Sequence, residues 1–211
     1  MSKIEGSQSA RLLPVGLTGG IGSGKSSVAR YCARQFGIDS IDADQVCREL
    51  LAPGGSGLEA FVSSFGGDYL AADGSIDRQR LRVAIFRNHK LRKRLNDLMH
   101  PLARRAIECM LARSEEPRRC LVEVPLLYEA GWEEDFSSVI VVYATEDCCL
   151  QRLMQRDQLS RVEAAEAIAA QLPLSEKACR ADHVIDNSGT WQETCLQILH
   201  LGKILWEGEP R

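Results

Sequence analysis

A glycine-rich segment near the start of the chain constrains the fold more than any other feature. Residues 19–26 read Gly-Gly-Ile-Gly-Ser-Gly-Lys-Ser and match the pattern G-x-x-x-x-G-K-[ST] at every fixed position. A short apolar run precedes this segment at residues 15–18, and a helical pattern follows it over residues 26–36. Because the motif sits between a strand and a helix, we predict a loop that wraps around a phosphate group.

Each residue type in this loop has a physical role. Glycines let the backbone turn tightly, so that successive N–H groups and the start of the helix point at the phosphate. Lys25 would contact the β- and γ-phosphates of a nucleotide, and the Ser26 hydroxyl is the candidate ligand of Mg²⁺. We expect Ser27 mainly to help start the helix. The predicted nucleotide-binding residues are Gly22, Ser23, Gly24, Lys25, Ser26 and Ser27.

Five short apolar runs, separated by helical patterns, predict a parallel sheet. The runs are continuously apolar rather than alternating, which is typical of strands that are buried on both faces. The repeated order of strand and helix predicts an α/β fold with a doubly wound parallel sheet. The predicted strands cover residues 15–18, 38–42, 120–124, 139–143 and 184–186.

Two connections are longer than a single helix requires. About eighty residues separate Ile41 from Leu121, with turn signals first and helical patterns over residues 78–87 and 90–113, which we expect Pro101 to interrupt. The second long connection, before residue 184, contains a capping box at Ser160 and Glu163. We therefore predict two helical insertions in the sheet scaffold and a closing helix over residues 191–206.

Two carboxylates end the second predicted strand, where ligands of open parallel sheets bind. A carboxylate there can orient an acceptor hydroxyl and take its proton during phosphoryl transfer. One of the pair can instead cap the helix that follows. We expect one residue in each role, with Asp44 as the base and Asp42 near the acceptor or at the cap.

The charge of the chain is unevenly distributed. The whole sequence has a net charge of −3, but residues 78–105 contain ten basic residues and one acidic residue, a local charge of +9. Such a segment favours an anionic ligand over a solvated helix face. Three further arginines, Arg152, Arg156 and Arg161, lie in the second insertion, where a lid arginine could close over the transferring phosphoryl group.

Several classes of protein are disfavoured. The base-reading Asn-Lys-x-Asp segment of GTPases is not found, and the length suits a small-molecule kinase better than a large ATPase. No apolar run is long enough to span a bilayer, and residues 1–11 lack the apolar stretch of a signal peptide. The eight cysteines form no Cys-x-x-Cys pair, so we expect mostly buried thiols in a cytoplasmic protein.

Taken together, the motifs resemble the dephospho-coenzyme A kinase family, a family of P-loop kinases. The likeness covers roughly residues 15–190 and follows the order of the family's motifs. The residues that carry it are 16–26 (GLTGGIGSGKS), 41–44 (IDAD), 95–102 (LNDLMHPL), 124–129 (VPLLYE), 154–157 (MQRD), 169–171 (AAQ) and 181–189 (ADHVIDNSG).

The resemblance implies a three-layer sheet of the P-loop NTPase type with a helical acceptor domain and a helical lid. It implies ATP as co-substrate, Mg²⁺, and phosphorylation of the ribose 3′-hydroxyl of dephospho-coenzyme A, with no nucleic-acid, membrane or obligate protein partner. Arg156 would be the lid arginine, and Arg161 a further lid contact with substrate. The implied acceptor-pocket residues are Asp42, His100, Pro125, Leu126 and Glu129.

The corresponding domain boundaries are residues 12–50, 119–147 and 182–208 for the nucleotide-binding core, 51–118 for the acceptor domain and 148–181 for the lid. Two alternatives remain open. One is another small-molecule kinase, of the nucleoside monophosphate, gluconate or shikimate type. The other is a nucleotide-gated module that binds RNA through the +9 segment, although that segment has only one aromatic residue, Phe86, for base stacking.

Overall fold

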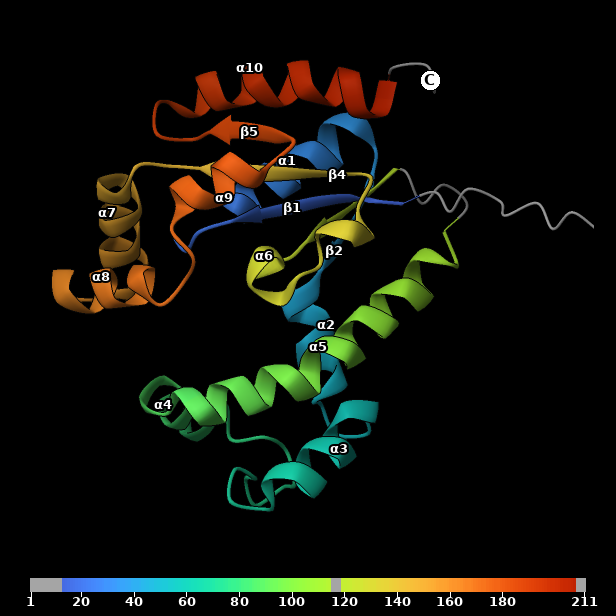
Figure 1. The fold of residues 1–211 in the computed structure, drawn as a ribbon, viewed down its shortest axis with the longest axis vertical. Coiled ribbons are helices and arrows are strands. Elements are labelled where there is room, and N and C mark those ends of the chain that lie inside the picture. Colours follow the sequence, from blue (N-terminus) through green and yellow to red (C-terminus); the bar gives the residue numbers. More distant parts are fainter. Residues whose placement is uncertain (1–12, 115–118, 208–211) are drawn as a thin grey trace, which may run out of the picture.

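A five-stranded parallel sheet forms the centre of the molecule. The computed structural model describes residues 13–114 and 119–207. The strands lie in the order β2-β3-β1-β4-β5, and every neighbouring pair is parallel (Figure 1). Their bounds are β1 Val15–Gly19, β2 Asp39–Asp42, β3 Cys120–Glu123, β4 Ser138–Tyr143 and β5 His183–Asp186. The predicted strands are therefore confirmed to within one residue at each end.

Helices cover both faces of the sheet, which gives three layers. On one face, α1 (Lys25–Phe36) and α10 (Trp191–Gly202) pack against Leu17, Leu121 and Ile140. On the other face, neighbouring strand residues such as Val122 and Val141 join a second core with α6 (Leu127–Ala130) and the C-terminal half of α5 (His89–Leu111). Successive strand residues point to opposite faces, so both cores are apolar. The predicted α/β class is confirmed.

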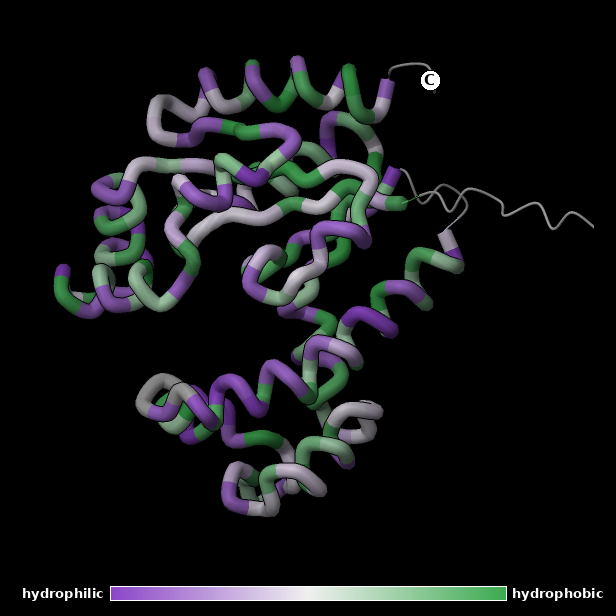
Figure 2. The backbone as a smooth tube through the Cα atoms, in the orientation of Figure 1, coloured by the Kyte–Doolittle hydropathy of each residue, from purple (hydrophilic) through white to green (hydrophobic). Residues whose placement is uncertain are grey.

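The connection between β2 and β3 forms a helical unit that lies below the sheet in the view of Figure 1. It contains α2 (Ala43–Leu50), α3 (Ser56–Phe65), α4 (Arg78–Arg87) and α5 (His89–Leu111). This unit has its own small core, centred on Phe61, Ile76 and Leu81. Figure 2 shows hydrophilic residues prevailing along the N-terminal half of α5, which belongs to the +9 segment.

The expectation that Pro101 interrupts the helix is wrong, because α5 runs through it from His89 to Leu111. A proline inside a helix removes one backbone hydrogen bond and crowds the preceding turn. Here Met99 and Ala103, on either side of Pro101, are buried, as is Ile107 one turn further. Packing of this face offsets the local cost of the proline. The short helix α3 was also not predicted, since turn signals dominate the sequence before it.

The second insertion contains α7 (Glu146–Asp157), α8 (Arg161–Ala169) and α9 (Leu174–Arg180), with α7 and α8 at the left edge of Figure 1. The predicted capping box is confirmed: the Ser160 side chain accepts from Glu163 N–H, and the Glu163 carboxylate accepts from Ser160 N–H. A small core of Leu150, Leu153 and Ala164 joins α7 to α8.

Helix α10 continues into a wider turn at Lys203–Glu207, so the predicted closing helix is regular only as far as Gly202. Cys32, Cys120 and Cys149 are buried, but Cys109 and Cys179 are exposed, so the expectation of mostly buried thiols holds only in part. Among the described helices, none is both long and apolar enough to cross a membrane.

Candidate active site

The glycine-rich loop follows β1 and leads directly into α1, as the sequence predicts. Gly22 and Gly24 adopt φ angles of +80° and +91°, which side-chain-bearing residues rarely adopt. A Cβ atom at Gly22 would lie 2.8 Å from the carbonyl oxygen of Cys149, and one at Gly24 would collide with the Asn187 amide. Both positions therefore require glycine. Helix α1 begins at Lys25, so its N-terminal N–H groups face this loop.

The side chains of Arg152 and Asn187 bind backbone carbonyl groups of the glycine-rich loop. The guanidinium of Arg152 donates to the carbonyl oxygens of Gly22 (3.4 Å), Ser23 (3.3 Å) and Asn187 (2.7 Å). The Asn187 amide also donates to the Ser23 carbonyl oxygen, at 2.7 Å. Because these carbonyls are directed at Arg152 and Asn187, the loop is held in shape by bonds independent of any phosphate. Sequence reasoning noted Arg152 but did not single it out, since nothing in its spacing distinguished it from Arg156 and Arg161.

Lys25, Glu123 and Asp44 form a charged cluster at the carboxyl edge of the sheet. The order of the strands explains it, because β3, which carries Glu123, lies between β2 and β1. The Lys25 ammonium lies 3.2 Å from Glu123 Oε2, and the Ser40 hydroxyl lies 3.5 Å from Oε1. Burial and the neighbouring carboxylate of Asp42 raise the pKa of Asp44, whereas the charge of Lys25 opposes this shift. The predicted base and the predicted phosphate-binding lysine therefore lie within electrostatic reach of each other.

The two aspartates after β2 have different environments. Asp42 caps α2: its Oδ1 accepts from the backbone N–H groups of Asp44 (2.9 Å) and Gln45 (3.4 Å), and its Oδ2 lies 3.5 Å from Arg48. Asp44 keeps exposed surface, and its side chain has no hydrogen-bond partner within the described part of the chain, but the protein atoms around it reduce the hydration of its carboxylate. It is thus the carboxylate that is available to an incoming hydroxyl, although its surroundings raise its pKa.

The residues present suit a magnesium ion bound mainly through phosphates. Ser26 lies exposed in the first turn of α1, beside the loop, whereas the Ser27 hydroxyl accepts a hydrogen bond from Arg30 within the same helix. The part of the chain described holds no cluster of three or more His, Cys, Asp or Glu side chains that could enclose a metal. Mg²⁺ commonly uses one or two protein oxygens together with phosphate and water. Ser26, with the nearby Glu123 carboxylate, fits that mode.

The other predicted acceptor residues lie on two elements. His100 of α5 meets Trp132 edge-on at 5.9 Å, burial lowers the pKa of His100, and both residues line a hollow of about 610 Å³ with Arg104 and Arg105. The segment 125–129 follows β3, and Leu126 is the N-cap residue of α6. Pro125 and Glu129 are engaged with the second insertion: Pro125 through its carbonyl oxygen, Glu129 through its carboxylate.

The two predicted lid arginines form their ion pairs within the second insertion. Arg156 forms a two-pronged pair with its neighbour Asp157, at 2.9 and 2.7 Å, and Arg161 lies 3.4 Å from Asp147. Both arginine side chains are more than 60 % exposed. The hydrogen bond from Arg156 lowers the pKa of Asp157, and the charge of Arg82 in α4 lowers it further. Arg82 of the helical unit therefore lies within electrostatic range of the second insertion.

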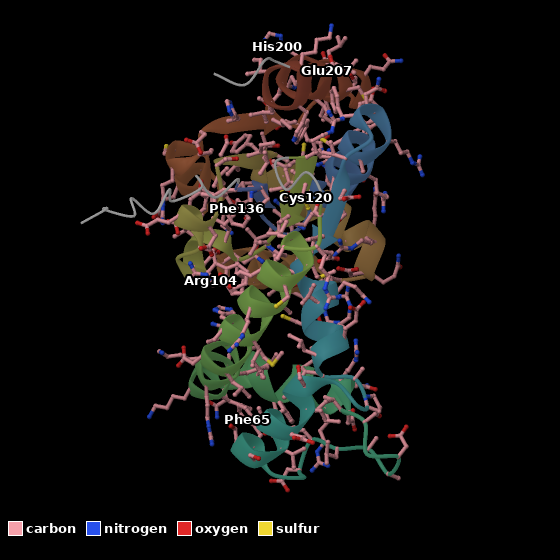
Figure 3. All side chains as sticks on the ribbon, turned by 90° about the vertical axis from the view of Figure 1, so that its right-hand side faces the viewer. Phe65, Arg104, Cys120, Phe136, His200 and Glu207 are labelled. Carbon is pink, nitrogen blue, oxygen red and sulfur yellow. The ribbon has the colours of Figure 1, made fainter. Side chains whose placement is uncertain are left out.

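Several charges of the basic segment have structural partners. Lys93 pairs with Asp97 at 2.8 Å, Arg94 bonds the Ser64 carbonyl and covers the Phe65 ring, and Arg104 pairs with Asp135. In Figure 3, Phe65 lies toward the opposite end of the molecule from His200, which belongs to α10. The side chains of Arg78 and Arg82 make no hydrogen bond or ion pair with the described residues. With Arg48 they border a hollow of about 180 Å³ whose apolar lining is Cys47, Leu51, Ile76, Leu81 and Ile85.

Comparison with known proteins identifies relatives that cover nearly the whole chain. A curated dephospho-CoA kinase of Geobacter metallireducens is 43 % identical over 203 residues, covering 95 % of this chain and 100 % of the relative. A crystal structure from Thermus thermophilus has a TM-score of 0.78 at 32 % identity, covering 94 % of this chain and 98 % of that one. The dephospho-CoA kinase of Campylobacter jejuni has a TM-score of 0.66 at 29 % identity, with coverages of 92 % and 98 %. The sequence model of the dephospho-CoA kinase family matches residues 13–193, and the chain belongs to that family.

Proposed function

We propose that this protein transfers the γ-phosphoryl group of ATP to the ribose 3′-hydroxyl of dephospho-coenzyme A. The products are coenzyme A and ADP, so the reaction is the final step of coenzyme A synthesis. One observation carries the proposal: Asp44, a solvent-accessible carboxylate at the end of β2, lies within electrostatic reach of Lys25 in a fully formed phosphate-binding loop. Membership of the dephospho-CoA kinase family supplies the identity of the acceptor.

The chain's own residues account for the chemical step. The N–H groups of the loop and Lys25 hold the β- and γ-phosphates and stabilise the charge that develops during transfer. The 3′-oxygen attacks the γ-phosphorus, the bond to the β–γ bridging oxygen breaks, and the hydroxyl proton passes to Asp44. Mg²⁺, when bound beside Ser26, neutralises phosphate charge. Glu123 orients Lys25 through their 3.2 Å ion pair.

The hollow between α2 and α4 suits the remainder of the acceptor. Arg48 lies four residues after Asp44 on α2, about 6 Å along the axis, so a ribose at Asp44 places its 5′-diphosphate near Arg48, Arg78 and Arg82. Arginine side chains match the planar, multiply charged oxygens of a diphosphate. The apolar lining beyond them can cover part of the pantetheine arm. We assign the acceptor diphosphate to these three arginines.

The parts of the fold then have separate tasks. Residues 12–50, 119–147 and 182–208 form the nucleotide-binding core, 51–118 receive the acceptor, and 148–181 act as the lid. In this scheme the Arg156–Asp157 pair opens when the lid closes, and Arg156 turns toward the transferring phosphoryl group. A cytoplasmic location suits the substrates of such an enzyme.

A panel of acceptors tests the proposal. ADP release is measured with ATP, Mg²⁺ and, in turn, dephospho-coenzyme A, shikimate, gluconate and nucleoside monophosphates. Of these acceptors, we expect only dephospho-coenzyme A to give a rate of ADP release above the rate with water as acceptor. We expect mass spectrometry of the product to place the phosphate on the 3′-oxygen. Turnover with another acceptor but not with dephospho-coenzyme A would show that the assignment is wrong.

A further inference from the structure

Lys177 of α9 carries a buried charge, and the proposed phosphoryl transfer does not involve it directly. Its side chain is completely buried. The ammonium lies 2.8 Å from Glu129 Oε1 and donates to the carbonyl oxygen of Pro125 at 3.0 Å. A buried ion pair contributes little net stability, because desolvation of both charges offsets their attraction, but it can fix the relative position of the elements that carry it. The elements joined here are α9, at the end of the second insertion, and the segment 125–129.

The Pro125 carbonyl connects Lys177 to the phosphate-binding side of the site. The same oxygen accepts a hydrogen bond of 3.2 Å from the hydroxyl of Thr18, which directly precedes the glycine-rich loop. Pro125 also stands two residues after Glu123, the partner of Lys25. One carbonyl oxygen is therefore held by donors from β1 and from α9, and it lies next to the strand end that orients Lys25.

The residues just before α9 make further contacts with the same two regions. The Gln171 side chain accepts a 2.9 Å hydrogen bond from the N–H of Ile21, inside the glycine-rich loop. The N–H of Leu172 donates to Glu129 Oε1 at 3.0 Å. Leu174 would lie 3.5 Å from a Cβ atom at Gly20. Residues 171–177, which we call the return segment, thus bind both the phosphate loop and the segment 125–129.

We propose that Lys177 is a positioning residue for phosphoryl transfer: it fixes the segment 125–129, and with it the end of β3, relative to the phosphate loop and the return segment. Neither its ammonium nor its stem has room to meet substrate, since both are buried, so it acts through Pro125 and Glu129. Without it, Glu123 and the acceptor side of the site lose their fixed distance from Lys25. Nucleotide affinity changes little, because Arg152, Asn187 and the glycines shape the loop separately.

The test compares Lys177→Met, which keeps the side-chain length but removes the charge, with Lys203→Met at an exposed lysine of the C-terminal turn. We expect Lys177→Met to lower kcat at least 10-fold and to raise KM for dephospho-coenzyme A, with Kd for a non-hydrolysable ATP analogue within about 3-fold of wild type. Lys203→Met should match wild type in all three. Equal kcat in the two variants, measured below their unfolding temperatures, would overturn the proposal.

A second variant separates positioning from stability. In Lys177→Met, Glu129 keeps a negative charge without its partner in a side chain that is 24 % exposed, so the unfolding temperature should fall. Glu129→Gln, added to Lys177→Met, removes that charge and should restore much of the unfolding temperature while kcat stays low. Recovery of kcat together with stability would show that Lys177 has only a structural role.

Two single variants decide the question if Lys177→Met does not fold. Thr18→Val removes the second donor to Pro125, and Glu129→Gln weakens the partner of Lys177; each should lower kcat while the ATP analogue still binds. Wild-type kcat in both would overturn the proposal.

The inference rests on the proposed function, but separate results contradict the two. If the wild-type protein is inactive on dephospho-coenzyme A, that result contradicts the proposed function and not the role of Lys177. The Lys177 comparison can then be repeated with whichever acceptor the panel identifies.

Discussion

The ammonium of Lys25 and the carboxylate of Glu123 form an ion pair of 3.2 Å between residues 98 positions apart in the sequence. Both side chains are nearly buried, with 12 % and 10 % of their surfaces exposed. Glu123 therefore holds the lysine at the edge of the glycine-rich loop before any phosphate arrives. A charge fixed in advance stabilises the transferring group without the cost of reorganising the site.

Lys25→Ala should abolish turnover, because it removes the only full positive charge within the phosphate-binding motif. It should also destabilise the fold by about 3 kcal/mol, since the buried Glu123 carboxylate then keeps, among the described residues, the side-chain contact with the hydroxyl of Ser40 at 3.5 Å. Chemical denaturation measures the second effect, and an ADP-release assay the first. Lys203→Ala serves as the control. Substantial residual turnover in Lys25→Ala would contradict the assigned role of the lysine.

The adjacent aspartates offer a matched pair of variants. Asp44→Asn should lower kcat by roughly 10²-fold or more while nucleotide binding persists, because the amide cannot accept the hydroxyl proton. Asp42→Asn should retain most activity, since asparagine caps a helix about as well as aspartate and only the 3.5 Å contact with Arg48 is weakened. Steady-state kinetics of the two variants measures the contrast. A larger loss in Asp42→Asn would transfer the base role to Asp42.

The fold was largely predictable from the sequence because its signals are local. Continuous apolar runs mark each buried strand, and the capping box marks the start of α8. Pro101 was misjudged because a sequence pattern shows the cost of a proline in a helix but not the burial of Met99 and Ala103 that offsets it. Local rules could not reveal that packing.

The site was predictable only where a motif fixes its geometry. The roles of Gly22 and Gly24 follow from their spacing, and their positive φ angles agree. By contrast, Arg152 and Lys177 act through contacts with residues 129 and 52 positions away, respectively. Such contacts depend on how the second insertion folds back onto the sheet. The spacing of residues along the chain does not predict that arrangement.

The raised pKa of Asp44 has a consequence for stability. Its folded-state pKa lies above the value in the unfolded chain, so the folded protein favours the protonated form. The ionised carboxylate therefore destabilises the fold at neutral pH, and this penalty disappears once the pH falls below the unfolded pKa, about 3.9. Asp44→Asn should raise the unfolding temperature at pH 7 relative to wild type, with a difference that shrinks as the pH falls toward 4. An unchanged difference across that range would contradict the shift.

Two arginines of α7 should affect different kinetic constants. Arg152→Lys should raise KM for ATP, because a lysine cannot reach the carbonyls of Gly22, Ser23 and Asn187 at once. Arg156→Lys should lower kcat and leave KM for ATP nearly unchanged, because the Arg156 side chain pairs with Asp157 in this structure and, in the proposed scheme, reaches the phosphoryl group when the lid closes. Initial rates at varied ATP separate the two. A kcat effect in Arg152→Lys alone would assign the catalytic lid role to Arg152 instead.

The arginines beside the 180 Å³ hollow should determine affinity for the acceptor. Arg82→Gln should raise KM for dephospho-coenzyme A about 10-fold, because a charge-assisted hydrogen bond to phosphate contributes roughly 1.5–3 kcal/mol, and KM for ATP should not change. Arg80→Gln is the matched control: it removes the same charge from the same helix, but Arg80 does not line the hollow. Equal increases in KM for both variants would point to the overall field of the +9 segment. A rise confined to Arg82→Gln supports direct contact with the diphosphate.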